Sequence, residues 1–319
     1  MVKLTPLTKN DFKEILLNYS IGQYISSKHL TKALENTVYY LKTTKGEFIL
    51  KVFEQIKIET IVFQTKVQKY LEKTNNPVPK IILSKEHKDI LYFGKKPIQI
   101  QKFAKGKRVR LDNNLIKDYG KVIGKISFDL SKLDLDGVFP WGKDFEFKKM
   151  KIYPGKQINL KNEHNKYLSQ LKKLDRKKLS RSIVHGDLNL DNTLVYKNKI
   201  NAIIDFGDTH NGFLVTDPTI FICDEIISKN KFNYKKIHIF IQAFEKKVKL
   251  NNEDKKAIYY FSKLRCIYSM NWCNQMLLKH KKGNRIDSLF LEYYSKYNLF
   301  SKEPIEDFIK KISVTRHLN

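Results

Sequence analysis

A change in the spacing of apolar residues near residue 104 restricts the fold of this 319-residue chain more than any other feature. Before it, segments 37–43 and 47–53 alternate apolar and polar residues around a short glycine-containing turn, which predicts a β-hairpin. After it, apolar residues recur at helical spacing, as in the stripe Ile116, Tyr119, Ile123, Ile126 and Leu130. The sequence therefore predicts an α+β fold in which a small sheet precedes a mainly helical region.

The sheet-rich part carries one expected helix, because Phe63, Val67 and Leu71 fall on one helical face. Three short apolar runs follow this helix, at residues 81–83, 90–93 and 98–103. We therefore expect an antiparallel-sheet lobe over residues 1–103 and a larger helical lobe over residues 104–319. Residues 104–107 are the candidate hinge.

Composition narrows the class of protein. The apolar fraction of 41% supports a packed core, and neither a membrane span of ~18 apolar residues nor a secretory signal is visible. The three cysteines, Cys223, Cys266 and Cys273, form no Cys-x-x-Cys pair, so a reducing compartment is the simpler interpretation. We expect a soluble, cytoplasmic protein without membrane contacts.

The net charge of +28 has two interpretations. It can attract a polyanion such as nucleic acid, or it can reflect lysines spread over solvated faces. The lysines are scattered and no nucleic-acid-binding motif accompanies them, so we favour the second interpretation and expect no nucleic-acid partner. The sequence indicates no oligomeric state.

The most informative segment is polar and lies between short apolar runs. Residues 185–192 read His-Gly-Asp-Leu-Asn-Leu-Asp-Asn, and Asp205 follows a further apolar strand. Phosphoryl transfer needs such residues, because it depends on positioning and on cations placed near the phosphoryl oxygens. Carboxylate and amide oxygens suit Mg²⁺, and a second carboxylate can orient a hydroxyl and accept its proton. A polar turn with capping carboxylates is the alternative. A metal hydrolase is disfavoured, since no histidine or cysteine cluster accompanies His185.

The same segment resembles the aminoglycoside phosphotransferase and choline kinase superfamily, whose hallmark is H-G-D followed by N and then I-D-F or I-D-W. The resemblance implies a protein-kinase-like two-lobed fold, ATP and Mg²⁺. It implies that Asp187 is the catalytic base, that His185 orients its loop, and that Asn192 and Asp205 bind Mg²⁺. It also places Asp208 and Asp217 near the acceptor. Asp217 has an alternative role as the cap of a helix that begins at Pro218.

Lys51 is the expected nucleotide lysine of the small lobe. It lies on a strand that is apolar on both faces, and a buried ammonium needs an anionic partner unless it reaches water. In the superfamily the matching lysine contacts the α- and β-phosphates and pairs with a helical glutamate. We expect Glu59 in that place, with Gln64 as the alternative.

The remaining nucleotide contacts are inferred from the expected fold. The phosphate loop should lie around residues 34–37 and include Asn36 and Thr37, without a glycine. Adenine should lie near residues 100–103, beside Gln101 and Phe103.

Residues 34–50 resemble the N-terminal stretch of the bacterial homoserine kinase branch. The expected acceptor is therefore a small-molecule hydroxyl, best matched by an amino-alcohol such as homoserine. Hydroxylysine, choline or ethanolamine, methylthioribose and aminoglycosides are alternatives. An amino-alcohol needs an acidic group for its ammonium, and Asp208, Asp217, Asp224 and Glu225 could line such a pocket. Trp141, Arg265 and Trp272 could also reach the acceptor, or serve packing.

Two other classes of protein fit the sequence less well. A protein kinase would carry Arg where this chain has Gly186, and an Ala-Pro-Glu segment further on. A non-catalytic basic binding protein with a kinase fold would not need Lys51, Asp187, Asn192 and Asp205 all intact.

Overall fold

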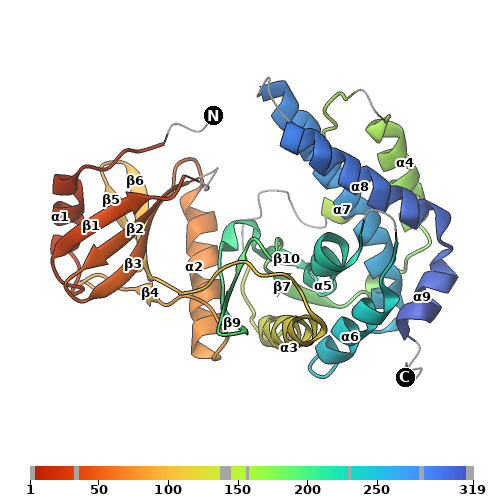
Figure 1. The fold of residues 1–319 in the computed structure, drawn as a ribbon, viewed down its shortest axis with the longest axis horizontal. Coiled ribbons are helices and arrows are strands. Elements are labelled where there is room, and N and C mark those ends of the chain that lie inside the picture. The colour runs from red at the N-terminus through yellow and green to blue at the C-terminus, as the bar shows by residue number, and fades with distance from the viewer. Residues whose placement is uncertain are drawn as a thin grey trace.

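The structure is a computed structural model that describes residues 4–31, 36–136, 145–155, 158–228, 231–279 and 284–313. It has a β-sheet region on one side and a helical region on the other (Figure 1). Among the helices of these residues, none combines the length and apolarity needed to traverse a bilayer.

The N-terminal region is an antiparallel sheet with strand order β1-β2-β3-β6-β4, to which β5 adds by pairing with β6. Its strands are β1 (Tyr24–His29), β2 (Thr37–Thr43), β3 (Gly46–Val52), β4 (Ile81–Ile82), β5 (Leu91–Phe93) and β6 (Lys96–Lys102). The predicted hairpin and the three later runs therefore form strands at or next to the expected positions. Their alternating apolar residues determine the register, because a slip by one residue would turn the buried face outward.

The two faces of this sheet differ. Phe48, Leu50 and Val52 of β3 are buried in a hydrophobic cluster with helix α1 (Lys9–Leu17). Lys51 lies on the opposite face. Helix α1 was not predicted, although Thr8 and Asp11 form a capping box ahead of its apolar residues, which is a readable start signal.

Helix α2 (Ile58–Lys73) lies between the sheet and the helical region (Figure 1). Its buried residues Phe63, Val67 and Leu71 match the predicted helical face. They pack into the large hydrophobic core of the helical region and not into the cluster under the sheet. Helix α2 therefore packs on the helical region, which also carries the polar segment.

The helical region is built on α3 (Asn113–Leu130), whose predicted stripe is fully buried. The other helices are α4 (Leu160–Leu171), α5 (Thr216–Phe221), α6 (Tyr234–Phe244), α7 (Asn252–Lys279), α8 (Asn284–Lys302) and α9 (Ile305–Ser313). Short turns occur at η1 (Phe145–Phe147), η2 (Arg176–Lys178), η3 (Phe206–Asp208) and η4 (Ile222–Ile226), the last being π-helical. Two further stripes of apolar residues lie on α4 (Tyr167, Leu168 and Leu171) and on α7 (Phe261, Leu264, Tyr268 and Trp272).

Two small antiparallel pairs hold the polar segment. Strand β7 (Arg181–Val184) pairs with β10 (His210–Phe213), and β8 (Thr193–Tyr196) pairs with β9 (Lys199–Ile203). The linker from the sheet joins this region, because Lys107 exchanges backbone hydrogen bonds with Val195. Residues 185–192 therefore connect β7 to β8, and each of these two strands is hydrogen-bonded to a partner strand.

Candidate active site

Residues 185–192, here called the polar loop, begin with a buried histidine. One ring nitrogen of His185, Nε2, lies 3.0 Å from the carbonyl oxygen of Ile204, and the other, Nδ1, accepts from the backbone N–H of Asp187 at 3.3 Å. The side chain is 1% exposed, so it is enclosed by the loop. Both ring nitrogens of His185 therefore contact the backbone, one at Ile204 and one within the loop.

Gly186 has a backbone conformation that other residues rarely adopt, with φ at +85°. A Cβ at this position would collide with the carbonyl oxygen of Asp208. The glycine therefore lets the polar loop lie directly on the segment after Asp205, and the arginine of protein kinases does not fit here.

Two carboxylates outside the polar loop accept hydrogen bonds from its backbone. Asp217 accepts from the backbone N–H groups of His185 at 2.8 Å and of Gly186 at 2.9 Å, and Glu225 accepts from that of Leu190 at 3.0 Å. Burial raises the pKa of Asp217, while nearby His185 and these two N–H donors act in the opposite direction. Both oxygens of Asp217 are occupied and it is 1% exposed, which argues against the expected substrate contact. It is a positioning residue.

Asp187 is fixed by three side chains. Its Oδ1 accepts from Asn189 and from Arg265, each at 3.0 Å, and its Oδ2 accepts from Asn192 at 2.9 Å. The carboxylate is 30% exposed, so it remains accessible. A base held in one orientation and open on one side is the arrangement that proton transfer from a bound hydroxyl needs.

Arg265 of α7 reaches this base, and its contacts were not foreseen. Its guanidinium bonds Asp224 through Nε at 3.2 Å and through Nη2 at 2.6 Å, in addition to Asp187. The π-helical turn η4 presents Asp224, and Tyr293 also donates to it at 2.9 Å. Burial alone would lower the pKa of Arg265, but the two carboxylates raise it instead. The sequence signal for a special role of Arg265 is that it is an arginine among the apolar residues Phe261, Leu264 and Tyr268.

Asn192 and Asp205 lie at the same end of the β8–β9 pair. Thr193 is paired with Ile203, and the N–H of Ile204 donates to the carbonyl oxygen of Asn192 at 2.9 Å. The amide nitrogen of Asn192 donates to Asp187, which leaves its Oδ1 to act as an acceptor. Asp205 adopts a left-handed conformation with φ at +63°, a feature that often marks functional sites. An amide oxygen and a 57% exposed carboxylate suit a hard cation such as Mg²⁺.

Lys51 pairs with Asp205 across the two regions, with Nζ 3.2 Å from Oδ1. The positive charge of Lys51 lowers the pKa of Asp205. The expectation that Glu59 pairs with Lys51 is wrong, because Glu59 lies exposed on the first turn of α2 and the ion pair is made with Asp205. The alternative, Gln64, is buried and donates to the carbonyl oxygen of Gly207 at 3.0 Å.

The other expected nucleotide residues have local partners. Thr37 donates to the buried carboxylate of Glu54, and Asn36 accepts from the N–H of Glu54 at 3.4 Å. The expected phosphate-loop residues Leu34 and Glu35 lie outside the described residues.

Gln101 lies on the same face of the sheet as Lys51 and donates to Gln99 at 2.8 Å and to Gln68 of α2 at 3.3 Å. Phe103 packs edge-on against Tyr40, and its N–H donates to the carbonyl of Glu47 at 3.1 Å. That N–H is engaged, so an adenine ring would have to use other groups of the linker.

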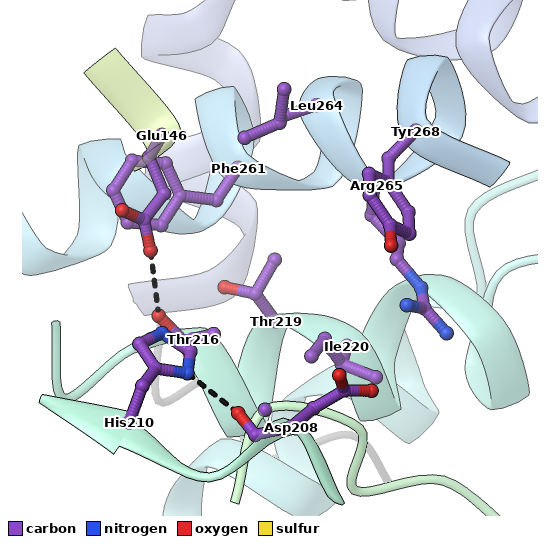
Figure 2. A pocket seen from close by; sticks show the side chains of 11 residues that line it. Glu146, Asp208, His210, Thr216, Thr219, Ile220, Phe261, Leu264, Arg265 and Tyr268 are labelled. Carbon is purple, nitrogen blue, oxygen red and sulfur yellow. Dashed lines mark hydrogen bonds between the residues drawn. The ribbon is translucent and has the colours of Figure 1, made fainter. Parts of the chain in front are cut away.

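A cavity of about 60 Å³ opens beside Gly186, and we call it the Gly186 pocket. Its lining combines apolar and polar side chains from η1, β10, α5 and α7 (Figure 2). The lining residues are Glu146, Gly186, Asp208, His210, Thr216, Thr219, Ile220, Phe261, Leu264, Arg265 and Tyr268.

Of the four acidic residues expected at the acceptor, only Asp208 lines this pocket. Glu146 also lines it and was not foreseen. Trp272 is half-buried against the large core, and Trp141 lies outside the described residues.

Comparison with known sequences identifies the family. The sequence profile of the Phosphotransferase enzyme family (APH) matches residues 28–230, which include Lys51, the polar loop and Asp205. The homoserine kinase of Bartonella henselae is 25% identical over 257 residues, which cover 76% of this chain and 78% of that protein. The homoserine kinase of Rhizobium meliloti is 22% identical over 269 residues, 81% of each chain.

Solved structures share the architecture. Amicoumacin kinase hAmiN, in complex with AMP-PNP, Ca²⁺ and Ami, superposes with a TM-score of 0.75 at 18% identity, covering 92% of this chain and 93% of that one. Spectinomycin phosphotransferase, in complex with ADP and spectinomycin, gives 0.62 at 15% identity, with 97% and 98% covered. These likenesses confirm the predicted two-lobed, protein-kinase-like fold. The profile spans more than half of the sequence, and the chain therefore belongs to the phosphotransferase enzyme family and is a kinase of the small-molecule type.

Proposed function

We propose that this enzyme transfers the γ-phosphoryl group of ATP to the hydroxyl of a small amino-alcohol, with homoserine as the first candidate. The observation that carries the proposal is the fixed Asp187 carboxylate, which accepts from Arg265 of the Gly186 pocket and from Asn192, the residue that lies with Asp205 at one end of the β8–β9 pair. The acceptor is supported by homoserine kinases that align with about four fifths of this chain.

In this proposal each side chain has a separate role. Asp187 orients the acceptor hydroxyl and takes its proton as the new O–P bond forms and the bond to ADP breaks. Lys51 binds phosphate oxygens of the nucleotide. His185, Asp217 and Glu225 keep the polar loop in place.

Asn192 and Asp205 would hold Mg²⁺ through their oxygens. Bound there, Mg²⁺ supplies positive charge that stabilises the phosphates during transfer. The part of the chain that the structure describes contains no cluster of three His, Cys, Asp or Glu side chains able to hold a metal. A cation at this site would therefore take further oxygen ligands from the nucleotide and water.

A coupled assay of ADP release tests the proposal. The acceptors are L-homoserine, 5-hydroxylysine, ethanolamine, choline, methylthioribose and kanamycin, each with MgATP. We expect turnover with L-homoserine that exceeds the acceptor-free rate and is lost in Asp187→Asn. If only another compound of the panel supports turnover, that compound replaces homoserine as the assigned acceptor. If no compound supports turnover, the result favours a non-catalytic binding protein.

A further inference from the structure

Glu146 of η1 is a buried carboxylate whose hydrogen bonds are incomplete. It is 2% exposed, and its Oε1 receives only a long contact of 3.5 Å from the hydroxyl of Thr216. Its Oε2 is buried and has no partner among the described residues. Figure 2 shows the carboxylate directed from η1 toward Thr216 and His210 across the Gly186 pocket. An unmet acceptor of this kind is costly, so the site is suited to a ligand that brings a donor.

The groups around Glu146 do not provide that donor. The hydroxyl of Tyr167 donates to the backbone carbonyl of Glu146, not to its carboxylate. His210 is bound through Nδ1 to the carbonyl oxygen of Asp208, and burial lowers its pKa to about 4, so it is neutral at pH 7. Arg181 is exposed on β7 and acts on Glu146 only through its charge.

The charges that face the pocket favour a cation. Glu146 and Asp208 are acidic. The one cation among the lining residues, Arg265, is already shared between Asp224 and Asp187. An incoming ammonium would therefore be attracted by these carboxylates.

We propose that Glu146 binds the ammonium group of the acceptor and selects a primary or secondary amine. This inference rests on the proposed function, since it assigns a role within the same site. The unmet Oε2 needs an N–H donor, which a quaternary ammonium such as choline lacks. The cavity of about 60 Å³ has room for the ammonium end of an amino-alcohol. Arg265 lines the pocket and donates to Asp187 at 3.0 Å, so the pocket and the proposed base share a side chain.

Proton linkage supports the assignment. Burial raises the pKa of Glu146 to about 7, against smaller opposing effects from its own backbone N–H, Thr216 and Arg181. An ammonium that pairs with the ionised carboxylate must displace the proton that Glu146 carries below pH 7. Binding of an amine at pH 6.5 should therefore release a fraction of a proton.

The test is calorimetric binding without nucleotide, so that it does not depend on turnover. The probes are L-homoserine, ethanolamine, choline and 4-hydroxybutyrate, which is homoserine without its amine. We expect the wild type to bind the two primary amines with proton release, measured in two buffers of different ionisation enthalpy. Glu146→Gln should weaken this binding on the order of 10- to 100-fold and abolish the proton release. Choline and 4-hydroxybutyrate should bind weakly to both proteins.

A control separates a local from a general effect. Glu163→Gln removes a mostly buried carboxylate of α4 outside the pocket and should leave amine binding unchanged. Equal amine binding by wild type and Glu146→Gln, or no amine binding by the wild type, would overturn the inference. Amine binding that depends on Glu146 but is followed by no phosphoryl transfer would overturn the proposed function and leave this inference standing.

Discussion

At the polar loop, Asp217 of α5 uses both carboxylate oxygens to accept backbone N–H groups of the loop, and Asp187 receives three side-chain donors. In the neighbouring Gly186 pocket, Glu146 is equally buried, yet it receives one long contact and keeps one oxygen without a partner. The first arrangement fixes the orientation of the Asp187 carboxylate. The second leaves one oxygen of Glu146 without a hydrogen bond, which a bound ligand can supply. Substitutions that remove a negative charge should therefore have opposite consequences in the two regions.

The largest effect is expected at Asp187. Asp187→Asn keeps the size of the side chain but removes the proton acceptor, so kcat should fall about 10³-fold. Nucleotide affinity should change little, because the residue faces the acceptor side. Steady-state kinetics with the best acceptor of the panel, together with calorimetric nucleotide binding, measure the two quantities. A variant that keeps more than a tenth of wild-type kcat would exclude Asp187 as the base.

The second effect concerns the cation site. Asp205→Ala should weaken Mg²⁺-dependent nucleotide binding about 100-fold, because it removes one of the two proposed metal ligands and the partner of Lys51. Asp191→Ala is the matched control, since Asp191 is exposed and pairs with Arg108 on the surface. Calorimetry with ADP in the presence of MgCl₂ or of EDTA makes the comparison. If EDTA weakens binding equally in all three proteins, Asp205 is not a ligand.

The third effect should have the opposite sign. The pKa of Glu146 rises from 4.5 to about 7 on folding, so its contribution to stability is present below pH 4.5 and is lost as pH rises through 7. Glu146→Gln escapes this loss and should be more stable than wild type by about 3 kcal/mol at pH 8, from about 1.4 kcal/mol for each pH unit. Urea unfolding at pH 5 and pH 8 measures the difference, which should fall to about 1 kcal/mol at pH 5. A lower stability of the variant at pH 8 would show that the carboxylate has a stabilising partner.

The smallest effect is expected at Asp217, and it tests whether the polar loop and the Gly186 pocket differ. Asp217→Asn also removes a buried negative charge, but its amide nitrogen faces a backbone N–H and replaces an acceptor with a donor. We expect a loss of about 2 kcal/mol in the free energy of unfolding and a lower kcat. Unfolding at pH 8 compares it directly with Glu146→Gln. Stabilisation by both substitutions would mean that the polar loop and the pocket do not differ.

Much of the fold was predictable because local patterns and final packing agree. The hairpin strands β2 and β3 and the buried stripe of α3 follow from residue spacing alone. Helix α1 was missed although its capping box was readable. The pairing of Lys51 was assigned to the wrong residue, because the distance from β3 to Asp205 depends on how the two regions meet.

The sequence by itself determined which side chains gather at the polar loop, since Asn192 contacts Asp187 and lies with Asp205 at one end of the β8–β9 pair. Only the tertiary structure placed Arg265 on Asp187 and Glu146 in the pocket beside Gly186. Those residues come from η1 and α7, far from the loop in sequence. The physical reason is that burial and hydrogen-bond supply arise from packing between distant segments, and residue spacing along the chain carries no record of them.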